Sequence, residues 1–339
     1  MLKLLNELCT IPGVSSDEGA VRDFVIRCAE KAGAAAETDP LGNVLIFKRG
    51  KRKPDRKIML CAHMDEVGLM ITYIHDNGYL GLSPVGGIDP RVIIGKRVII
   101  GQGRVPGVIG LKPPHLSGVD EKSSVPDISD MLLDIGAGSG EEAAERVSLG
   151  DTAYFDSMPI MLSGNMLKAR AIDDRLGCAV MLELIESDLP IDCHFAFTVQ
   201  EEVGCRGAFA AAFNLKPDIA LILEGTTAAD LPSVKDSKRI CSPGKGVVIP
   251  FMDGGTVYDR ELYDVLTSLA QSRDIPWQTK RYIAGGTDAR VIQRSRGGVK
   301  TAALAVAVRN IHSPASIANT SDMQGMLELA TLFLEEMSQ

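Results

Sequence analysis

The sequence contains no unbroken apolar run of about 20 residues, the length that a membrane-spanning helix requires, so we expect no transmembrane segment. Its opening residues, MLKLLNELCTIPG, lack the apolar stretch and the cleavage site of a signal peptide. The seven cysteines are odd in number and form no C-x-x-C pair, which indicates free thiols in a reducing compartment. We therefore expect a cytoplasmic protein.

An excess of positive charge is also missing. The formal net charge of −8 argues against nucleic acid as the main partner, because neutralising phosphates needs a basic face. The one basic cluster, KRGKRKPDRK, contains Gly50 and Pro54 and is typical of a solvated loop. Aromatic residues make up only 5% of the chain, whereas 34 glycines suit an α/β protein with many tight loops.

The 339 residues exceed what one compact core usually covers, so we expect two domains. Helical patterns alternate with apolar runs, which indicates a sheet covered by helices on both faces. One such pattern, residues 15–33, predicts a helix with a serine cap. The runs predict four buried strands: KIMLCAH (57–63), HFAFTV (194–199), IALIL (219–223) and TAALAVAV (301–308).

Residues 67–160 differ from the rest of the chain in their sequence pattern. Short β-rich pieces there are separated by Gly and Pro and predict a small β-barrel or sandwich, with a short helix capped at or near Ser139. We interpret this segment as an insert in a catalytic domain formed by residues 1–66 and 161–339. The insert begins after AHMDE and ends before ARAIDDR, so we expect it to roof or border the active site.

Histidines and carboxylates follow the ends of the predicted strands, where α/β sheets form their ligand sites. Taken alone, each of these motifs has an ordinary explanation: a solvated strand end, an Asp helix cap or a surface histidine. Two of only five histidines, however, occur together with several carboxylates in this position, so we predict that they converge. The motifs are AHMDE (His63, Asp65), ARAIDDRLG (Asp173, Asp174), VQEEVG (Glu201, Glu202), LEGTTAAD (Glu224) and RNIHSP (His312).

The donor types indicate a metal centre. Two imidazoles and several carboxylates suit Zn²⁺, Co²⁺ or Mn²⁺ in a hydrolytic site. The adjacent Glu201 and Glu202 point different ways, so one can bind a metal while the other faces the reacting water. We interpret Cys61, Cys178 and Cys205 as small buried apolar residues and not as ligands.

Seven motifs in this order resemble those of metallopeptidase family 42, the dinuclear-metal aminopeptidases. The resemblance covers essentially the whole chain and implies a mixed sheet between helices and peptide substrates with a free N-terminus. It also implies two divalent ions per subunit, for which Zn²⁺ and Co²⁺ are the first candidates and Mn²⁺ is another. It further implies homo-oligomers of dimers, up to dodecamers, with the insert as dimerisation or lid domain. The motifs are AHMDEVGLM, KARAIDDRLG, TVQEEVGCRGA, EGTTAAD, PGKGVVI, GGTDA and RNIHSP.

Residue roles follow from the same resemblance. It implies that His63 and His312 each bind one metal and that Asp173 bridges the two. Glu202 and Glu224 would complete the two coordination shells. Many relatives have Asp where this chain has Glu224, which keeps the oxygen donor but changes its reach.

Two further roles concern catalysis. The resemblance implies that Glu201 is the general base and that Asp65 orients His63. It also implies a cis peptide bond between Asp173 and Asp174, and a substrate-pocket wall at residues 285–290, GGTDAR, whose side-chain preference the sequence does not reveal.

Three alternatives stay open. A dinuclear-metal deacylase or carboxypeptidase would share the metal centre. Such enzymes usually carry an α/β insert, however, whereas the insert expected here is β-rich. Glycoside hydrolysis needs two carboxylates and no metal. A non-catalytic oligomeric scaffold would not need every ligand type, and all of them are present here.

Overall fold

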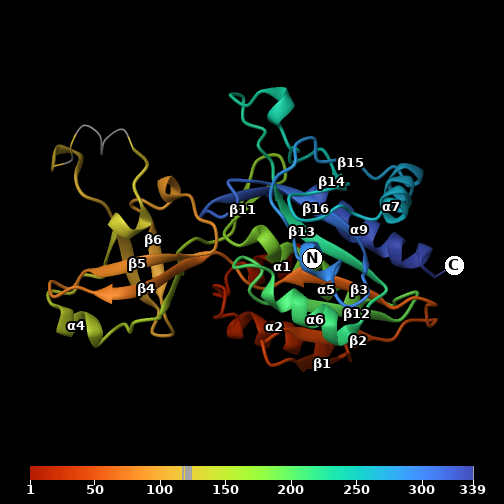
Figure 1. Ribbon diagram of the computed structural model, residues 1–339, viewed down its shortest axis with the longest axis horizontal. Helices are drawn as coiled ribbons and strands as arrows, with labels where there is room; N and C mark the ends of the chain where they lie inside the picture. The colour runs from red at the N-terminus through yellow and green to blue at the C-terminus, as the bar shows by residue number, and fades with distance from the viewer. Residues whose placement is uncertain (117, 119–123, 339) are drawn as a thin grey trace.

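The computed structural model describes residues 1–116, 118 and 124–338. Residues 117 and 119–123 of the expected insert lie outside the described residues, as does Gln339. Figure 1 shows a small β-barrel on one side of a larger α/β body. Among the described helices, none has both the length and the apolar character needed to cross a bilayer.

Within the described part of the chain, eleven strands form one mixed sheet in the larger body. Its centre is parallel and its flanks are antiparallel. The parallel strands, in spatial order, are β12 (Cys193–Thr198), β3 (Ile58–His63), β13 (Ile219–Thr227) and β16 (Lys300–Arg309). The other strands are β1 (Ala35–Thr38), β2 (Val44–Lys48), β17 (Ser316–Asn319), β11 (Met166–Ala169), β10 (Ile160–Leu162), β14 (Val247–Val248) and β15 (Trp277–Gln278).

The central strands are apolar throughout because both of their faces are covered. In β3, Ile58, Leu60 and Ala62 pack into the larger core cluster, whereas Met59 and Cys61 pack into a second cluster on the opposite face. Alternate side chains of a strand point to opposite faces, so a strand between two helical layers needs an unbroken apolar run. The four apolar runs therefore form the strands that the sequence predicts.

Helices cover both faces of the sheet, which confirms the predicted arrangement of one sheet between two helical layers. The helices of the larger layer are α1 (Leu2–Leu8), α2 (Gly19–Lys31), α5 (Ile172–Glu186), α7 (Arg260–Ser272) and α9 (Thr320–Glu336). The opposite layer contains α6 (Arg206–Leu215) and α8 (Ala289–Ile292).

The predicted serine cap of α2 is wrong. Glu18 occupies the cap position, and its side chain makes no capping hydrogen bond. The Ser15 hydroxyl instead donates to Asp65 Oδ2 at 2.6 Å, a partner about fifty positions away that no local pattern reveals.

A second sheet closes into an antiparallel barrel, as expected from the short β-rich pieces. Leu69, Leu80, Val98, Ile109 and Leu133 contribute to its separate apolar core. Ser139 caps the short helix α4 (Gly140–Ala144), as predicted. The barrel strands are β4 (Gly68–Ile74), β5 (Leu80–Val85), β8 (Leu132–Asp134), β7 (Val105–Gly110), β6 (Arg97–Ile100) and β9 (Thr152–Phe155).

A buried ionic cluster joins the barrel to the sheet. Glu66, directly before the barrel, contacts both Arg170 and Arg175, and all three side chains are at most 3% exposed. The Arg170 guanidinium also lies 4.7 Å from the ring centre of Tyr154 in β9. Arg175 donates to the backbone carbonyls of Leu8 and Met64 at 2.6 and 2.9 Å. One carboxylate thus balances two buried cations where the two bodies meet.

We expect Glu66→Gln to lower the free energy of unfolding by about 3 kcal/mol, because it leaves two buried guanidinium groups without their carboxylate. Thermal or urea denaturation measures this loss. Asp264→Asn is the control, since it breaks an exposed, solvent-screened pair with Arg260 (2.9 Å) and should leave the stability almost unchanged. Equal stability of Glu66→Gln and the unmodified protein would contradict the prediction.

Candidate metal centre

The register of the parallel strands places His63 beside Glu224. Strand β13 pairs Ile222 with Cys61 of β3, so Glu224 and His63 each lie two residues beyond this pair. His63 Nε2 is 3.1 Å from Glu224 Oε1, and both side chains are almost fully buried. The carboxyl edge of the sheet therefore carries an imidazole and a carboxylate in contact, as the sequence predicts.

Asp173 lies between the two histidines. Its Oδ1 is 3.6 Å from His63 Nε2 and its Oδ2 is 3.5 Å from His312 Nε2. The backbone N–H of Gly225 donates to Oδ1 at 3.2 Å. A Cβ atom at Gly225 would meet this carboxylate at 2.8 Å, so glycine permits the close approach of Asp173 to the strand. The Asp173–Asp174 peptide bond is cis, as the resemblance implies.

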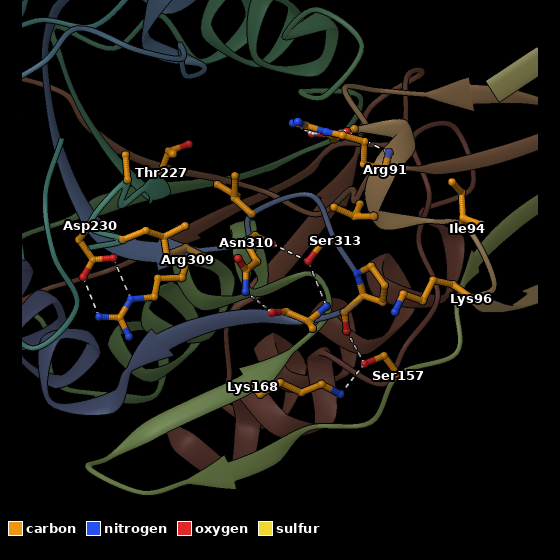
Figure 2. A pocket seen from close by; sticks show the side chains of 18 of the residues that line it. Arg91, Ile94, Lys96, Ser157, Lys168, Thr227, Asp230, Arg309, Asn310 and Ser313 are labelled. Atoms are coloured by element: carbon orange, nitrogen blue, oxygen red, sulfur yellow. Dashed lines mark hydrogen bonds and ion pairs between the residues drawn. The ribbon is translucent and has the colours of Figure 1, made fainter. Parts of the chain in front are cut away.

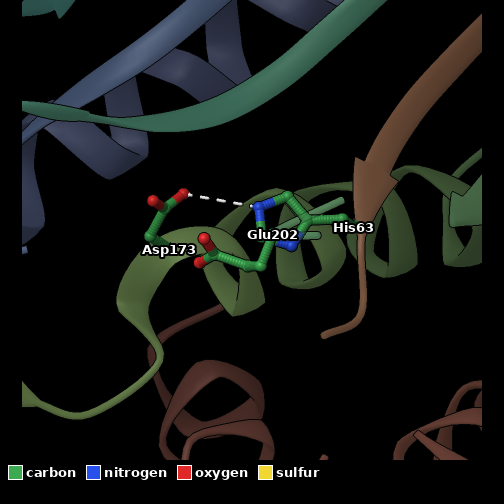
Figure 3. Close-up of side chains that lie close together, drawn as sticks. All are labelled: His63, Asp173 and Glu202. Atoms are coloured by element: carbon green, nitrogen blue, oxygen red, sulfur yellow. Dashed lines mark ion pairs between the residues drawn. The ribbon is translucent and has the colours of Figure 1, made fainter. Parts of the chain in front are cut away.

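His312 completes the group from the turn after β16. Its Nε2 is 3.2 Å from Glu202 Oε1, and its Nδ1 is 2.8 Å from the carbonyl oxygen of Gly87. Because a carbonyl only accepts, Nδ1 carries the proton and Nε2 faces the carboxylates. Gly87 follows β5 of the barrel, so the insert supports a site on the sheet. Figure 3 shows Asp173 and Glu202 gathered around His63.

Asp65 holds the Glu201–Glu202 turn. Its two carboxylate oxygens accept from the backbone N–H groups of Glu201 and Glu202 at 2.9 and 3.1 Å. Its Oδ1 is 3.4 Å from His63 Nδ1, and its backbone oxygen is 3.0 Å from the same nitrogen. Asp65 thus lies against His63, as expected, and also fixes the backbone of two further site residues.

Charges in this cluster shift one another. Burial raises the pKa of Glu224 well above its ordinary value, and the neighbouring Asp173 and Asp174 charges add to the rise. Burial acts on Asp173 too, but hydrogen bonds from His312 and His63 outweigh it and lower its pKa. Burial lowers the pKa of His312, yet Asp173 and Glu202 overcome this effect and raise it to about 11. Without metal ions, protons on the imidazoles and carboxyl groups balance the negative charge of this cluster. Bound metal cations would take over that role.

The donors fit divalent metal ions. Single atoms of His63, Asp173 and Glu202 lie within 4.8 Å of one another, and so do those of His63, Asp174 and Glu224. Glu202 Oε1 is buried, and His312 Nε2 lies 3.2 Å from it. Imidazole and carboxylate donors gathered this closely suit ions such as Zn²⁺ or Co²⁺.

Glu201 is next to this group and is placed differently. Burial raises its pKa to about 8, with further increases from Asp288 and Glu202 and an opposing effect of His63. The Cys205 thiol donates to Glu201 Oε1 at 3.3 Å. Cys205 is buried, as predicted, but it also orients this glutamate. Asp288, which the sequence reasoning did not single out, accepts from Thr198 Oγ1 at 2.6 Å behind the site.

Two adjoining clefts open at the site. A cleft of about 360 Å³ is lined by Asp173, Glu201, Glu202, Glu224 and His312. A larger cleft of about 720 Å³ lies between the barrel and the sheet and shares two lining residues, Thr227 and Ile311, with the first. In Figure 2 the barrel contributes Arg91, Ile94 and Lys96 to one wall of this cleft, opposite Arg309 and Asp230.

A mixed α/β sheet with two histidines and clustered carboxylates at its carboxyl edge defines a class of metal-dependent hydrolases. Residues 42–329 match the family described as M42 glutamyl aminopeptidase. The chain belongs to this family and is a metal-dependent aminopeptidase.

Relatives across nearly the whole length agree with this assignment. A lysyl aminopeptidase of Pyrococcus furiosus is 32% identical over 99% of this chain and 97% of its own. A glutamyl aminopeptidase of Lactococcus lactis is 33% identical over 93% of this chain and 90% of its own. The two names differ in the N-terminal residue, so family membership does not decide the specificity of this chain.

Solved structures agree with the fold. An aminopeptidase from Desulfurococcus kamchatkensis superposes with a TM-score of 0.93 at 34% identity, covering 99% of this chain and 96% of its own. The TET1 peptidase of Pyrococcus horikoshii, described as able to form a tetrahedron or an octahedral shell, has a TM-score of 0.86 at 35% identity, with 97% and 98% covered. Both neighbours are described as peptidases, and both share the fold of this chain over nearly its whole length.

Proposed function

We propose that this protein hydrolyses the N-terminal peptide bond with the help of two divalent ions, and that the Asp173 carboxylate would be a ligand shared by both. One observation carries this proposal: the two oxygens of the Asp173 carboxylate face two different imidazoles, at 3.6 and 3.5 Å. A carboxylate between two nitrogen donors is the arrangement that a shared ligand requires.

The remaining ligands divide between the two ions. We propose that His63 and Glu224 bind one ion, since they are 3.1 Å apart, and that His312 and Glu202 bind the other, at 3.2 Å. Nitrogen and oxygen donors without thiolates favour Zn²⁺ or Co²⁺, with Mn²⁺ as a third candidate. Glu224 reaches His63 directly, so a glutamate at this position keeps an oxygen donor in range.

Glu201 moves the proton. When bound, the two ions would polarise the scissile carbonyl and lower the pKa of the attacking water. The Glu201 carboxylate takes a proton from that water and gives it to the leaving amine. Contacts from Cys205 and Asp65 fix its side chain and its backbone for this exchange.

The two clefts divide the substrate. We propose that the smaller cleft holds the N-terminal residue of a peptide with a free α-amine, because the metal ligands line it. The larger cleft would hold the residues after the scissile bond, because it adjoins the smaller cleft at Thr227 and Ile311.

Initial rates on aminoacyl-p-nitroanilides test the proposed function. Each substrate is supplied with a free and an N-blocked amine, to apo enzyme and to enzyme reloaded with Zn²⁺, Co²⁺ or Mn²⁺. We expect metal-dependent cleavage of the free-amine substrates only. Cleavage of the blocked substrates alone would instead support a deacylase with the same metal centre.

We also propose an assembly and a location. The barrel, within residues 67–160, would form dimers that build larger homo-oligomers, as the oligomeric neighbours suggest. A monomer in light scattering at working concentration would contradict this assembly. All seven cysteines are free thiols, which supports a cytoplasmic location that cell fractionation can test.

A further inference from the structure

The turn that carries Glu201 and Glu202 is held by side chains from three distant segments. Strand β12 ends at Thr198, and each of the next four residues donates its backbone N–H to a side-chain oxygen, at 2.9 to 3.1 Å. The acceptors, all at most 6% exposed, are Asn43 for Val199, Glu18 for Gln200, and Asp65 for Glu201 and Glu202. An unpaired N–H group away from water is costly, so the course of the turn depends on these three side chains.

Within this turn, Gln200 has an uncommon backbone conformation. Its φ is +57°, in the left-handed region that residues other than glycine rarely occupy. Such a conformation costs about 1 kcal/mol or more, and it persists only where the surrounding structure holds it. The N–H of Gln200 donates to Glu18 Oε1, and the next residue along the chain is Glu201. The contact with Glu18 therefore holds the peptide that leads into Glu201.

The Glu18 carboxylate binds this turn and does not cap the helix that follows it. A carboxylate directly before a helix such as α2 ordinarily caps the free N–H groups or complements the helix dipole. The Glu18 side chain makes no capping hydrogen bond. Its Oε1 instead accepts from the N–H of Ser16 at 2.9 Å and from that of Gln200, which is 182 positions away along the chain. A charge at a helix start does not need this reach, so the contact with Gln200 is a separate role of the side chain.

We propose that Glu18 is a positioning residue for proton transfer, which holds Gln200 and thereby keeps the Glu201 carboxylate where it meets the attacking water. This inference rests on the proposed function, in which Glu201 is the general base. Glu18 is absent from the described linings of both clefts, so it would act through Glu201 and not by binding the substrate. A catalytic group displaced by about 1 Å can lose about 100-fold in rate. Such a loss appears in kcat and leaves KM unchanged.

Two substitutions separate the reach of the Glu18 side chain from its charge. Glu18→Gln keeps the length and one oxygen acceptor but removes the charge, whereas Glu18→Asp keeps the charge and is one methylene shorter. The measurement is kcat and KM at saturating metal, on the free-amine p-nitroanilide that the unmodified protein cleaves fastest. We expect kcat to fall about 10- to 100-fold in Glu18→Asp, whereas Glu18→Gln should retain most of it. KM and the content of metal ions should stay the same in both variants.

Glu30→Asp and Glu30→Gln are the matched controls, since Glu30 is exposed in the last turn of the same helix. Both should leave kcat unchanged. An impaired Glu18→Gln, whatever the activity of Glu18→Asp, would show that the charge is required and would overturn the inference. A Glu18→Asp protein that is less stable but keeps its kcat would overturn it too, and so would a fall in kcat that only follows the loss of metal ions.

Glu18→Met takes the place of Glu18→Asp if the latter does not fold, because methionine has a similar length and no oxygen. The same fall in kcat is expected. If the unmodified, metal-loaded protein cleaves no free-amine substrate, the proposed function is rejected, and the positioning role with it. If that protein is active and the shorter or oxygen-free variant has the same kcat, only the positioning role is overturned.

Discussion

Glu201→Gln should abolish nearly all turnover, by about 10²- to 10⁴-fold or more, while the protein still binds both metal ions. The amide has the shape of the carboxylate but cannot accept the proton of the attacking water. Glu201 lies outside the contacts that join His63, Asp173 and His312, so its charge is not needed to hold the ligands together. Steady-state rates and metal content, measured on the same sample, check both parts of this prediction.

The result is specific because neighbouring contacts are preserved in the variant. The backbone N–H of residue 201 still donates to Asp65, and the Cys205 thiol can still donate to the amide oxygen. A loss of activity can therefore be assigned to proton transfer and not to a displaced turn. Substantial turnover in a metal-replete Gln variant would remove Glu201 from the role of general base.

Asp173→Ala should release both ions. A ligand shared by two ions affects both when it is lost, whereas the loss of His63 or His312 removes one donor from one ion. We expect elemental analysis to find two ions per subunit in the unmodified protein and almost none in Asp173→Ala. Activity should fall at least as far as in Glu201→Gln.

Asp230→Ala is the control for metal content. Asp230 pairs with Arg309 in the larger cleft at 2.6 Å and is not among the proposed ligands, so this variant should retain both ions. Two ions per subunit in Asp173→Ala would show that Asp173 is not the bridge. Glu201→Gln and Asp173→Ala together separate metal binding from proton transfer. Both should be inactive, but only Glu201→Gln should still contain its metal ions.

Much of the fold and the metal centre is readable from the sequence, for a physical reason. The four central strands are covered on both faces and therefore had to be continuous apolar runs. Their parallel direction brings the residues after them to one edge. The positions of His63, Glu202, Glu224 and His312 at or after the ends of these strands were therefore enough to predict that they lie close together.

Other contacts of the site could not be predicted, because they join positions with no periodic relation. Gly87 lies on a loop and Cys205 at a helix end, and the course of both segments depends on tertiary packing. Glu224 follows the end of the predicted strand, yet β13 continues to Thr227, so even here the boundary depended on pairing with β16. The wrong serine cap has the same cause, since the partner of Ser15 is distant in sequence.

The carbonyl of Gly87 has a consequence for protein engineering. One acceptor on a loop of the barrel sets which nitrogen of a histidine after β16 is protonated. A chimera that exchanges the barrel for that of a relative must therefore return an acceptor to the same point, to within hydrogen-bond distance. If the graft loses that acceptor, the imidazole is free to rotate or to change tautomer, although every residue of the sheet is retained. The barrel thus helps to fix the orientation of a histidine that belongs to the larger body.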